Sequence, residues 1–203
     1  MSAALSRWPE EEDEFAMAED KFARLVAFLR RQESRELDHA ELEVTLTEQG
    51  RELMRELFQA HVNSRGPGPA AGPVCGADEV ERNVRRLHER RLTTVFGEVQ
   101  VKRLGYGATG VKSLHPLDAE LNLPAEEYSL GVRRLAAVHA AKESFDDTVE
   151  AVAQQTGKTV GKRQIEELVQ RSAVDFDTFY EQRRPTPGEA SGSILAISAD
   201  GNG

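Results

Sequence analysis

Cysteine, aromatic residues and long apolar runs are scarce in this chain of 203 residues. The one cysteine, Cys75, lies in a stretch of proline and glycine, and it has no second thiol for an intramolecular disulfide or a metal site. No stretch approaches the ~20 apolar residues that cross a bilayer, and the N-terminus lacks the basic and apolar regions of a secretory signal. These absences exclude disulfide-rich and membrane-spanning proteins, and they make a cytoplasmic location the expectation.

Motifs for metal binding or nucleophilic catalysis are missing as well. The histidines have no ligand spacing with one another or with Cys75, so we expect surface or packing roles for His39, His61, His88, His115 and His139. The segment Gly105-Tyr106-Gly107 lacks the strand-to-helix context of a phosphate-binding loop. No pair of a nucleophile and a histidine can be proposed.

Charge is unevenly distributed along the chain. The formal net charge is −9, which argues against simple nucleic-acid binding. Residues 1–20 carry seven acids and one arginine, whereas residues 82–103 carry seven basic residues against two acids, a local charge of +5. The basic segment could therefore hold a phosphate backbone.

Helical spacing dominates the N-terminal third of the chain, after an acidic tail at residues 1–13. The pattern predicts helices over residues 14–31 and 38–62, with a bend allowed at Gly50. An apolar stripe on the second helix consists of Leu42, Leu46, Leu53, Leu57 and Phe58. The short connection favours an intramolecular hairpin at residues 14–63, and pairing of this stripe with a second copy is the alternative.

A β-hairpin is predicted after a proline- and glycine-rich linker at residues 64–77. Residues 92–96 are β-formers, Gly97-Glu98 is predicted as the turn, and Val99 and Val101 then alternate with polar residues. We expect valines on one face and basic residues on the other, and a loop at residues 105–118. The candidate phosphate contacts on this ribbon are Arg85, Arg86, Arg90, Arg91, Lys102 and Arg103. A solvated face of an ordinary hairpin is the alternative.

Helical patterns return after Pro124, over residues 126–143, 145–156 and from about residue 160. Ser144 is predicted as an N-cap, Gly157 as a C-cap and Thr159 as the next N-cap. Two short helices joined at a glycine suggest a helix-turn-helix. In that motif Lys158 and Lys162 suit phosphates, and Arg163 and Gln164 suit base edges. The apolar residues of the second helix begin late for the tightest turn, so a longer turn or an ordinary helical hairpin stays open.

The C-terminal stretch predicts a short helix at residues 175–183, a linker at 185–193 and a strand at 194–197, followed by Asp200. In RNase H-like folds the first metal-binding carboxylate lies on the first strand of the sheet, and carboxylates suit Mg²⁺. Asp-Gly after a strand is more often a turn, which is the alternative for Asp200.

The order of these segments resembles the Kra-type insertion-sequence group of bacterial DDE transposases. The segments are TVFGEVQVKRLGYG, SLHPLDAELNLP, FDDTVEAVAQQTGKTVGKRQIEELVQ, VDFDTFYEQRR and ILAISADGNG, and the resemblance covers roughly residues 20–203. It implies that residues 1–190 bind DNA and that Asp200 is the first of three catalytic acids, the others lying beyond residue 203. The full-length enzyme would use Mg²⁺, whereas the chain as given would hold no cofactor and not act as an enzyme. A cysteine-rich knuckle common in the group is missing at residues 105–108, so no zinc site is implied.

We therefore predict a mainly α protein with a β-hairpin. Its parts are an acidic tail (1–13), a helical hairpin (14–63), a linker (64–77), a β-hairpin with helix-turn-helix-like DNA-binding helices (78–184), and a linker with the first strand of a truncated catalytic domain (185–203). The predicted function is recognition of double-stranded transposon-end DNA. The alternatives are a helix-turn-helix transcriptional regulator and a helical dimerisation protein without DNA affinity.

Overall fold

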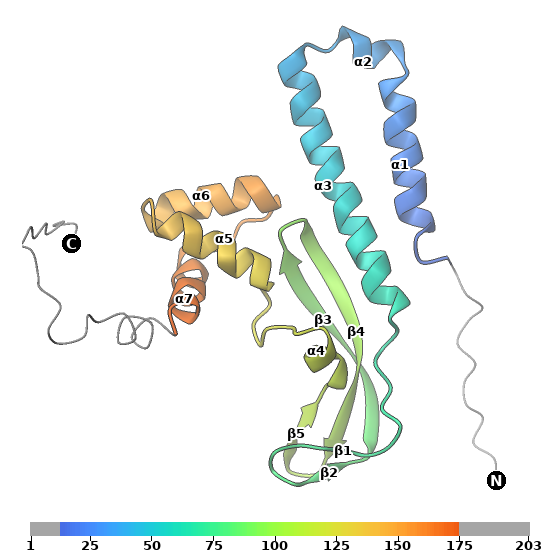
Figure 1. Ribbon diagram of the computed structural model, residues 1–203, viewed down its shortest axis with the longest axis vertical. Coiled ribbons are helices and arrows are strands. Elements are labelled where there is room, and N and C mark those ends of the chain that lie inside the picture. Colours follow the sequence, from blue (N-terminus) through green and yellow to red (C-terminus); the bar gives the residue numbers. More distant parts are fainter. Residues whose placement is uncertain (1–12, 175–203) are drawn as a thin grey trace, which may run out of the picture.

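The computed structural model describes residues 13–174 (Figure 1). The helices are α1 (Ala16–Leu29), α2 (Gln32–Glu36), α3 (His39–Ser64), α4 (Pro116–Glu120), α5 (Leu130–Ala140), α6 (Phe145–Thr156) and α7 (Lys162–Ser172), and the strands are β1 (Val74–Cys75), β2 (Glu81–Arg82), β3 (Val84–Thr94), β4 (Gly97–Ala108) and β5 (Val111–Leu114). With about 52% helix and 20% strand among residues 13–174, the prediction of a mainly α protein with a β-hairpin is confirmed. The acidic tail up to residue 12, the helix at 175–183, the strand at 194–197 and Asp200 lie outside the described residues.

Helices α1 and α3 lie side by side as a long helical hairpin, with α2 in the connection (Figure 1). Asp38 begins α3 with a capping box: its carboxylate accepts from the Glu41 N–H (2.9 Å), and the Glu41 carboxylate accepts from the Asp38 N–H (3.0 Å). The helix then continues through Gly50. Of the predicted leucine stripe, Leu53 is buried and Leu46 is exposed.

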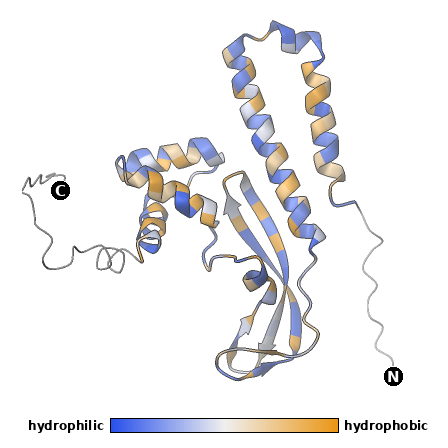
Figure 2. Ribbon diagram, viewed as in Figure 1, coloured by the Kyte–Doolittle hydropathy of each residue, from blue (hydrophilic) through white to orange (hydrophobic). Residues whose placement is uncertain are grey.

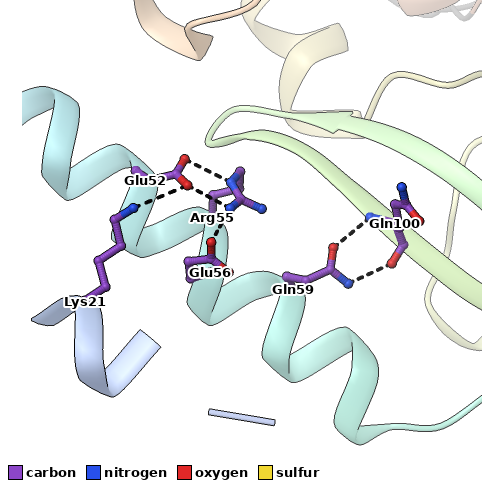
Figure 3. A network of polar contacts seen from close by, with 6 residues as sticks. All are labelled: Lys21, Glu52, Arg55, Glu56, Gln59 and Gln100. Carbon is purple, nitrogen blue, oxygen red and sulfur yellow. Dashed lines mark hydrogen bonds and ion pairs between the residues drawn. The ribbon is translucent and has the colours of Figure 1, made fainter. Parts of the chain in front are cut away.

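The C-terminal half of α3 covers the β-sheet. Phe58 and Val62 pack in one apolar cluster with Leu92, Val99 and Val101. The polar edge of this contact is a double hydrogen bond. The Gln59 side chain donates to the Gln100 carbonyl (2.8 Å) and accepts from the Gln100 N–H (2.7 Å), as Figure 3 shows. Helix α3 and the β-hairpin therefore share one core.

The segment predicted as a linker lies against the sheet. The Pro67 carbonyl accepts from the Leu104 N–H (2.8 Å), and the Ala70 N–H donates to the Tyr106 hydroxyl (2.6 Å). Tyr106 is fully buried as a result. The segment also contains the short strand β1 at Val74–Cys75, and these contacts hold its backbone against the sheet.

Strands β3, β4 and β5 form an antiparallel sheet in which polar and apolar residues alternate (Figure 2). Thr94 pairs with Gly97, so the two-residue turn is Val95-Phe96 and the predicted turn at Gly97-Glu98 is wrong. The Thr94 hydroxyl donates to the Gly97 carbonyl (2.8 Å), and Gly97 takes a φ of +123°, which only glycine adopts readily.

Residues 105–118 are not a loop, contrary to prediction. Strand β4 continues to Ala108, and β5 and α4 follow. The glycines in this stretch led to the prediction of a loop, but Gly105 lies within β4 and leaves room for neighbouring side chains. A Cβ at Gly105 would lie 2.7 Å from the His88 ring and 3.0 Å from that of His115. The strand needs glycine because two imidazoles lie over it.

Helices α5, α6 and α7 pack around a core of their own, which consists of Val132, Ala136, Val152, Val160, Ile165 and Leu168. Ser129 and Ser144 cap α5 and α6 by accepting from backbone N–H groups three residues later, at 3.2 Å in each case. The Ser144 prediction is confirmed. Helix α7 has Gly161 at its N-cap, so the prediction of Thr159 there is wrong.

Candidate nucleic-acid interface

The pair α6–α7 has the element order of a helix-turn-helix, with residues 157–161 as its connection. Gly157 ends α6 in the left-handed conformation (φ +68°), and its N–H donates to the Ala153 carbonyl (2.8 Å). Val160 is buried and anchors the connection, while Lys158 is exposed beside it. The five-residue connection is compatible both with a helix-turn-helix that has a longer turn and with an ordinary helical hairpin.

The basic side chains predicted for this turn face solvent. Lys158, Lys162 and Arg163 are all exposed. Lys162 pairs with Asp146 on α6 (2.9 Å), and Arg163 pairs with Glu167 one turn further along α7 (3.2 Å). Exposed ion pairs of this kind contribute little, so a phosphate can compete for either cation.

Gln164 is placed differently from the three cations. It is half-buried, and a Cβ at Gly161 would lie 2.4 Å from the Gln164 side-chain oxygen. The side chain therefore folds back over Gly161, the N-cap of α7. To read a base edge as predicted, Gln164 would have to change its rotamer.

Acidic residues limit the extent of this basic surface. Residues 145–172 carry four basic and five acidic residues. Asp146 and Asp147 lie in the first turn of α6, and Glu166 and Glu167 follow in the second turn of α7. On the helix pair α6–α7, a duplex can therefore approach favourably only near residues 158–163.

The basic residues of the β-hairpin do not share one face, contrary to prediction. Cross-strand partners point to the same side of a sheet. Lys102 pairs with Glu89, whereas Arg103 pairs with His88 on the side of the buried valines. One face therefore carries Arg85, Arg91 and Lys102, and the other carries Arg86, Arg90 and Arg103. Side chains alternate strictly along a strand, so Val99, Val101 and Arg103 lie on the same face. The sequence pattern itself therefore places Arg103 with the valines and not with Lys102.

Arg90 and Arg103 serve the fold. Both guanidinium groups pair with the Asp118 carboxylate on α4, Arg90 at 3.8 Å and Arg103 more closely, and Arg90 also donates to the Pro124 carbonyl (2.6 Å). Their side chains are only 9% and 14% exposed. We therefore remove both from the candidate phosphate contacts.

The four remaining basic residues of the ribbon, Arg85, Arg86, Arg91 and Lys102, are exposed. The Arg85 guanidinium lies 5.6 Å from the centre of the Tyr106 ring, a cation–π arrangement that orders this side chain. A backbone phosphate could still reach it from solvent.

Three polar groups that sequence reasoning missed join elements far apart in the chain. The Arg51 side chain on α3 donates to the Gln154 carbonyl at the end of α6 (3.0 Å). His88 on β3 and His115 before α4 share a hydrogen bond (2.9 Å). Glu126 pairs with Arg133 and with Arg171 (2.9 Å for the latter), which ties α5 to α7. The two residues of each contact lie 7 to 103 positions apart in the sequence. Residue spacing in the sequence therefore does not predict these contacts.

Metal binding has no structural support in the described part of the chain. Between residues 13 and 174, no three or more His, Cys, Asp or Glu side chains are grouped to hold an ion. Within the same range, no helix has both the length and the apolar character needed to cross a membrane.

Comparison with known proteins gives one similarity to a curated protein. The chain is similar to the "UPF0236 protein in vanSb 3'region" of Streptococcus gallolyticus, with 33% identity over 89 residues, or 43% of this chain. The matched stretch covers 20% of that protein, so the chain corresponds to about a fifth of its length. No family profile matches the chain, and no solved structure does.

Proposed function

We propose that this chain is the DNA-binding region of an insertion-sequence transposase and that it recognises transposon-end duplex DNA. One observation carries the proposal. Three exposed cations, Lys158, Lys162 and Arg163, stand on the turn and first helical turn of a helix-turn-helix-like pair that packs with α5 around one apolar core. The similarity to a much longer curated protein is compatible with a region that works within a larger chain.

In this proposal the N-terminus of α7 enters a major groove. Arg163 contacts a base edge, and Lys158 and Lys162 contact the flanking phosphates. The exposed ribbon residues Arg85, Arg86, Arg91 and Lys102 add sequence-independent phosphate contacts. Catalysis stays with the full-length enzyme, in which Asp200 would bind Mg²⁺ together with acids beyond residue 203.

The first test is salt-dependent binding to a fluorescently labelled duplex, followed by anisotropy. Each phosphate contact releases counterions, so log Kd should change linearly with log salt concentration. The triple variant Lys158→Ala, Lys162→Ala, Arg163→Ala should weaken binding by roughly 10- to 1000-fold and reduce the magnitude of the salt slope by about 2.

The matched control removes the same charge at the far end of the helical hairpin. Arg24, Arg30 and Arg31 are exposed there, and the triple alanine variant at these positions should bind as the parent does. Equal loss of affinity in both triple variants would show a nonspecific charge effect and contradict the assignment of α7. A preference for the transposon end over unrelated duplex separates the transposase from a regulator with a genomic site.

Self-association is a second candidate function, favoured by apolar side chains left exposed on the helical hairpin. These are Met17, Phe22, Leu29, Val44, Leu46 and Met54. We propose pairing of two chains through this hairpin, with Leu46 as the exposed member of the leucine stripe. Sedimentation of the parent as a monomer at micromolar concentration would refute the pairing.

A further inference from the structure

Besides the packing of Val95, in the hairpin turn, against its core, the unit formed by α5, α6 and α7 contacts the rest of the molecule at two places (Figure 1). The first is residues 124–129, which run beside β3 and enter α5. There Thr93 donates its N–H to the Glu127 carbonyl (2.7 Å) and accepts from the Ser129 N–H (2.8 Å). The second place is the end of α6, which meets α3. Since the covalent attachment lies at the start of α5, the contact at α3 must oppose rotation of the unit about it.

The contact at α3 depends on Arg51. Its guanidinium donates to the Gln154 carbonyl (3.0 Å). Within residues 13–174 this is the single hydrogen bond between α3 and residues 130–172, and no ion pair joins them. The guanidinium also covers Gly157, where a Cβ would lie 2.9 Å from the Arg51 Cζ and Nε atoms. Glycine at position 157 thus permits both the left-handed turn and the approach of Arg51.

An arginine suits this place for a physical reason. The last carbonyl groups of a helix lack intrahelical partners and carry the negative end of the helix dipole. In α6 the Val152 carbonyl accepts from the Thr156 hydroxyl (2.8 Å), and the Ala153 carbonyl accepts from the Gly157 N–H (2.8 Å). The Gln154 carbonyl accepts from Arg51 instead, so a side chain of α3 contributes to the cap of α6.

The surroundings of Arg51 make this hydrogen bond the main contact between α3 and α6. A cleft separates α3, the hairpin turn and the end of α6, and its lining includes Glu48, Glu52, Arg55, Glu98 and Lys158. Phe96 of the hairpin turn also lines this cleft, but its charged walls stay hydrated and supply little apolar packing between α3 and α6. Removal of one arginine can therefore release α6 from α3 without exposing a core.

We propose that Arg51 is a positioning residue, which latches the three-helix unit to α3 and so fixes the direction of residues 158–163 relative to the basic ribbon. The inference rests on the proposed DNA-binding function. A duplex that contacts both surfaces binds more tightly when their relative geometry is preset, because binding then does not have to order the two surfaces and the effective concentration of the second contact is higher.

Spin labels on the full chain test the latch directly. In a Cys75→Ser background, labels at Thr47→Cys on α3 and Glu150→Cys on α6 occupy exposed positions on the two bodies. The parent should give one narrow distance distribution, and Arg51→Ala should broaden it. Arg51→Lys should restore it in part, because an ammonium group can still donate one hydrogen bond. Arg24→Ala, which removes an exposed charge on α1, should change nothing.

Duplex affinity is measured on the same variants. Arg51→Ala should weaken binding by roughly tenfold while the thermal midpoint stays near that of the parent, and Arg24→Ala should bind as the parent does. A narrow distribution in Arg51→Ala overturns the latch. A broadened distribution with unchanged affinity overturns the positioning role. If the parent binds no duplex, the proposed function fails, while the distance distributions still decide whether Arg51 is a latch.

Discussion

Two imidazole groups meet beneath α4, where His88 and His115 hydrogen-bond over Gly105. One nitrogen of the pair must donate and the other must accept, so two protonated rings cannot keep the contact. Arg90, Arg103 and Asp118 lie around His115, and the arginines outnumber the carboxylate. The site is therefore suited to neutral imidazole.

We expect stability to decrease in mild acid because of this pair. Burial first, and the charge of Arg103 second, hold the pKa of His115 below its ordinary value of 6.5. The unfolded chain therefore binds a proton at His115 more readily than the folded chain does. The contribution of neutral His115 to the free energy of unfolding is complete above pH 6.5 and is lost as the pH falls below 6.5. Urea midpoints between pH 7.5 and 5.5 should decline, and His115→Asn should flatten the decline. A decline as steep in the variant as in the parent would refute the role of His115.

At the scale of elements, α1 and α3 are joined by a polar network that Figure 3 shows. The Glu52 carboxylate accepts from Arg55 (2.7 and 2.9 Å) and pairs with Lys21 on α1 (3.4 Å). The hydrogen bonds from Arg55 lower the pKa of Glu52 from 4.5 to about 2, against the effect of burial. The Glu52 carboxylate thus pairs with both Lys21 and Arg55 and joins α1 to α3.

Substitution of this carboxylate should destabilise the helical hairpin modestly. Glu52 is 39% exposed, so solvent screens the pair and the loss in Glu52→Gln should stay below about 1 kcal/mol. The contribution is present above pH 4.5 and lost as the pH falls towards 2, since the folded pKa is the lower one. Thermal melts at pH 7 and pH 3 measure it. The difference between parent and variant should shrink at pH 3, and a constant difference would contradict the assignment.

Sequence reasoning predicted elements well where a short pattern specifies them. Ser144 and Gly157 lie at the ends of α6 as predicted, because these cap signals come from residues next to the helix ends, although the same reasoning placed the N-cap of α7 at Thr159 instead of Gly161. The turn at Val95-Phe96 and the strand through Gly105 were missed, because tertiary contacts of Gly97 and Gly105 override their loop-like composition. The basic residues of the ribbon were predicted on one face, although the alternation of side chains along β4 separates Lys102 from Arg103. Arg90 and Arg103 find their partner in Asp118, which local spacing cannot indicate.

At the scale of the whole molecule, α3 determines what can fold alone. Phe58 and Val62 belong to the core beneath β3 and β4, so a fragment of residues 78–174 lacks one wall of that core. We expect this fragment to unfold or aggregate, and a fragment of residues 38–174, which keeps the cap of α3, to fold cooperatively. Circular dichroism melts compare the two. A cooperative transition in the shorter fragment would show that the predicted boundary at residues 64–77 separates independent domains.

The length of α3 has a consequence for any partner of the helical hairpin. The helix is unbroken from His39 to Ser64, and at about 1.5 Å per residue the stretch from its start to Phe58 measures about 29 Å. It acts as a rigid spacer, with one end fixed in the sheet and the other joined to α2. A partner bound at the α2 end would be kept roughly 30 Å from the ribbon, and a tilt of the helix would move that partner far more than it moves the sheet.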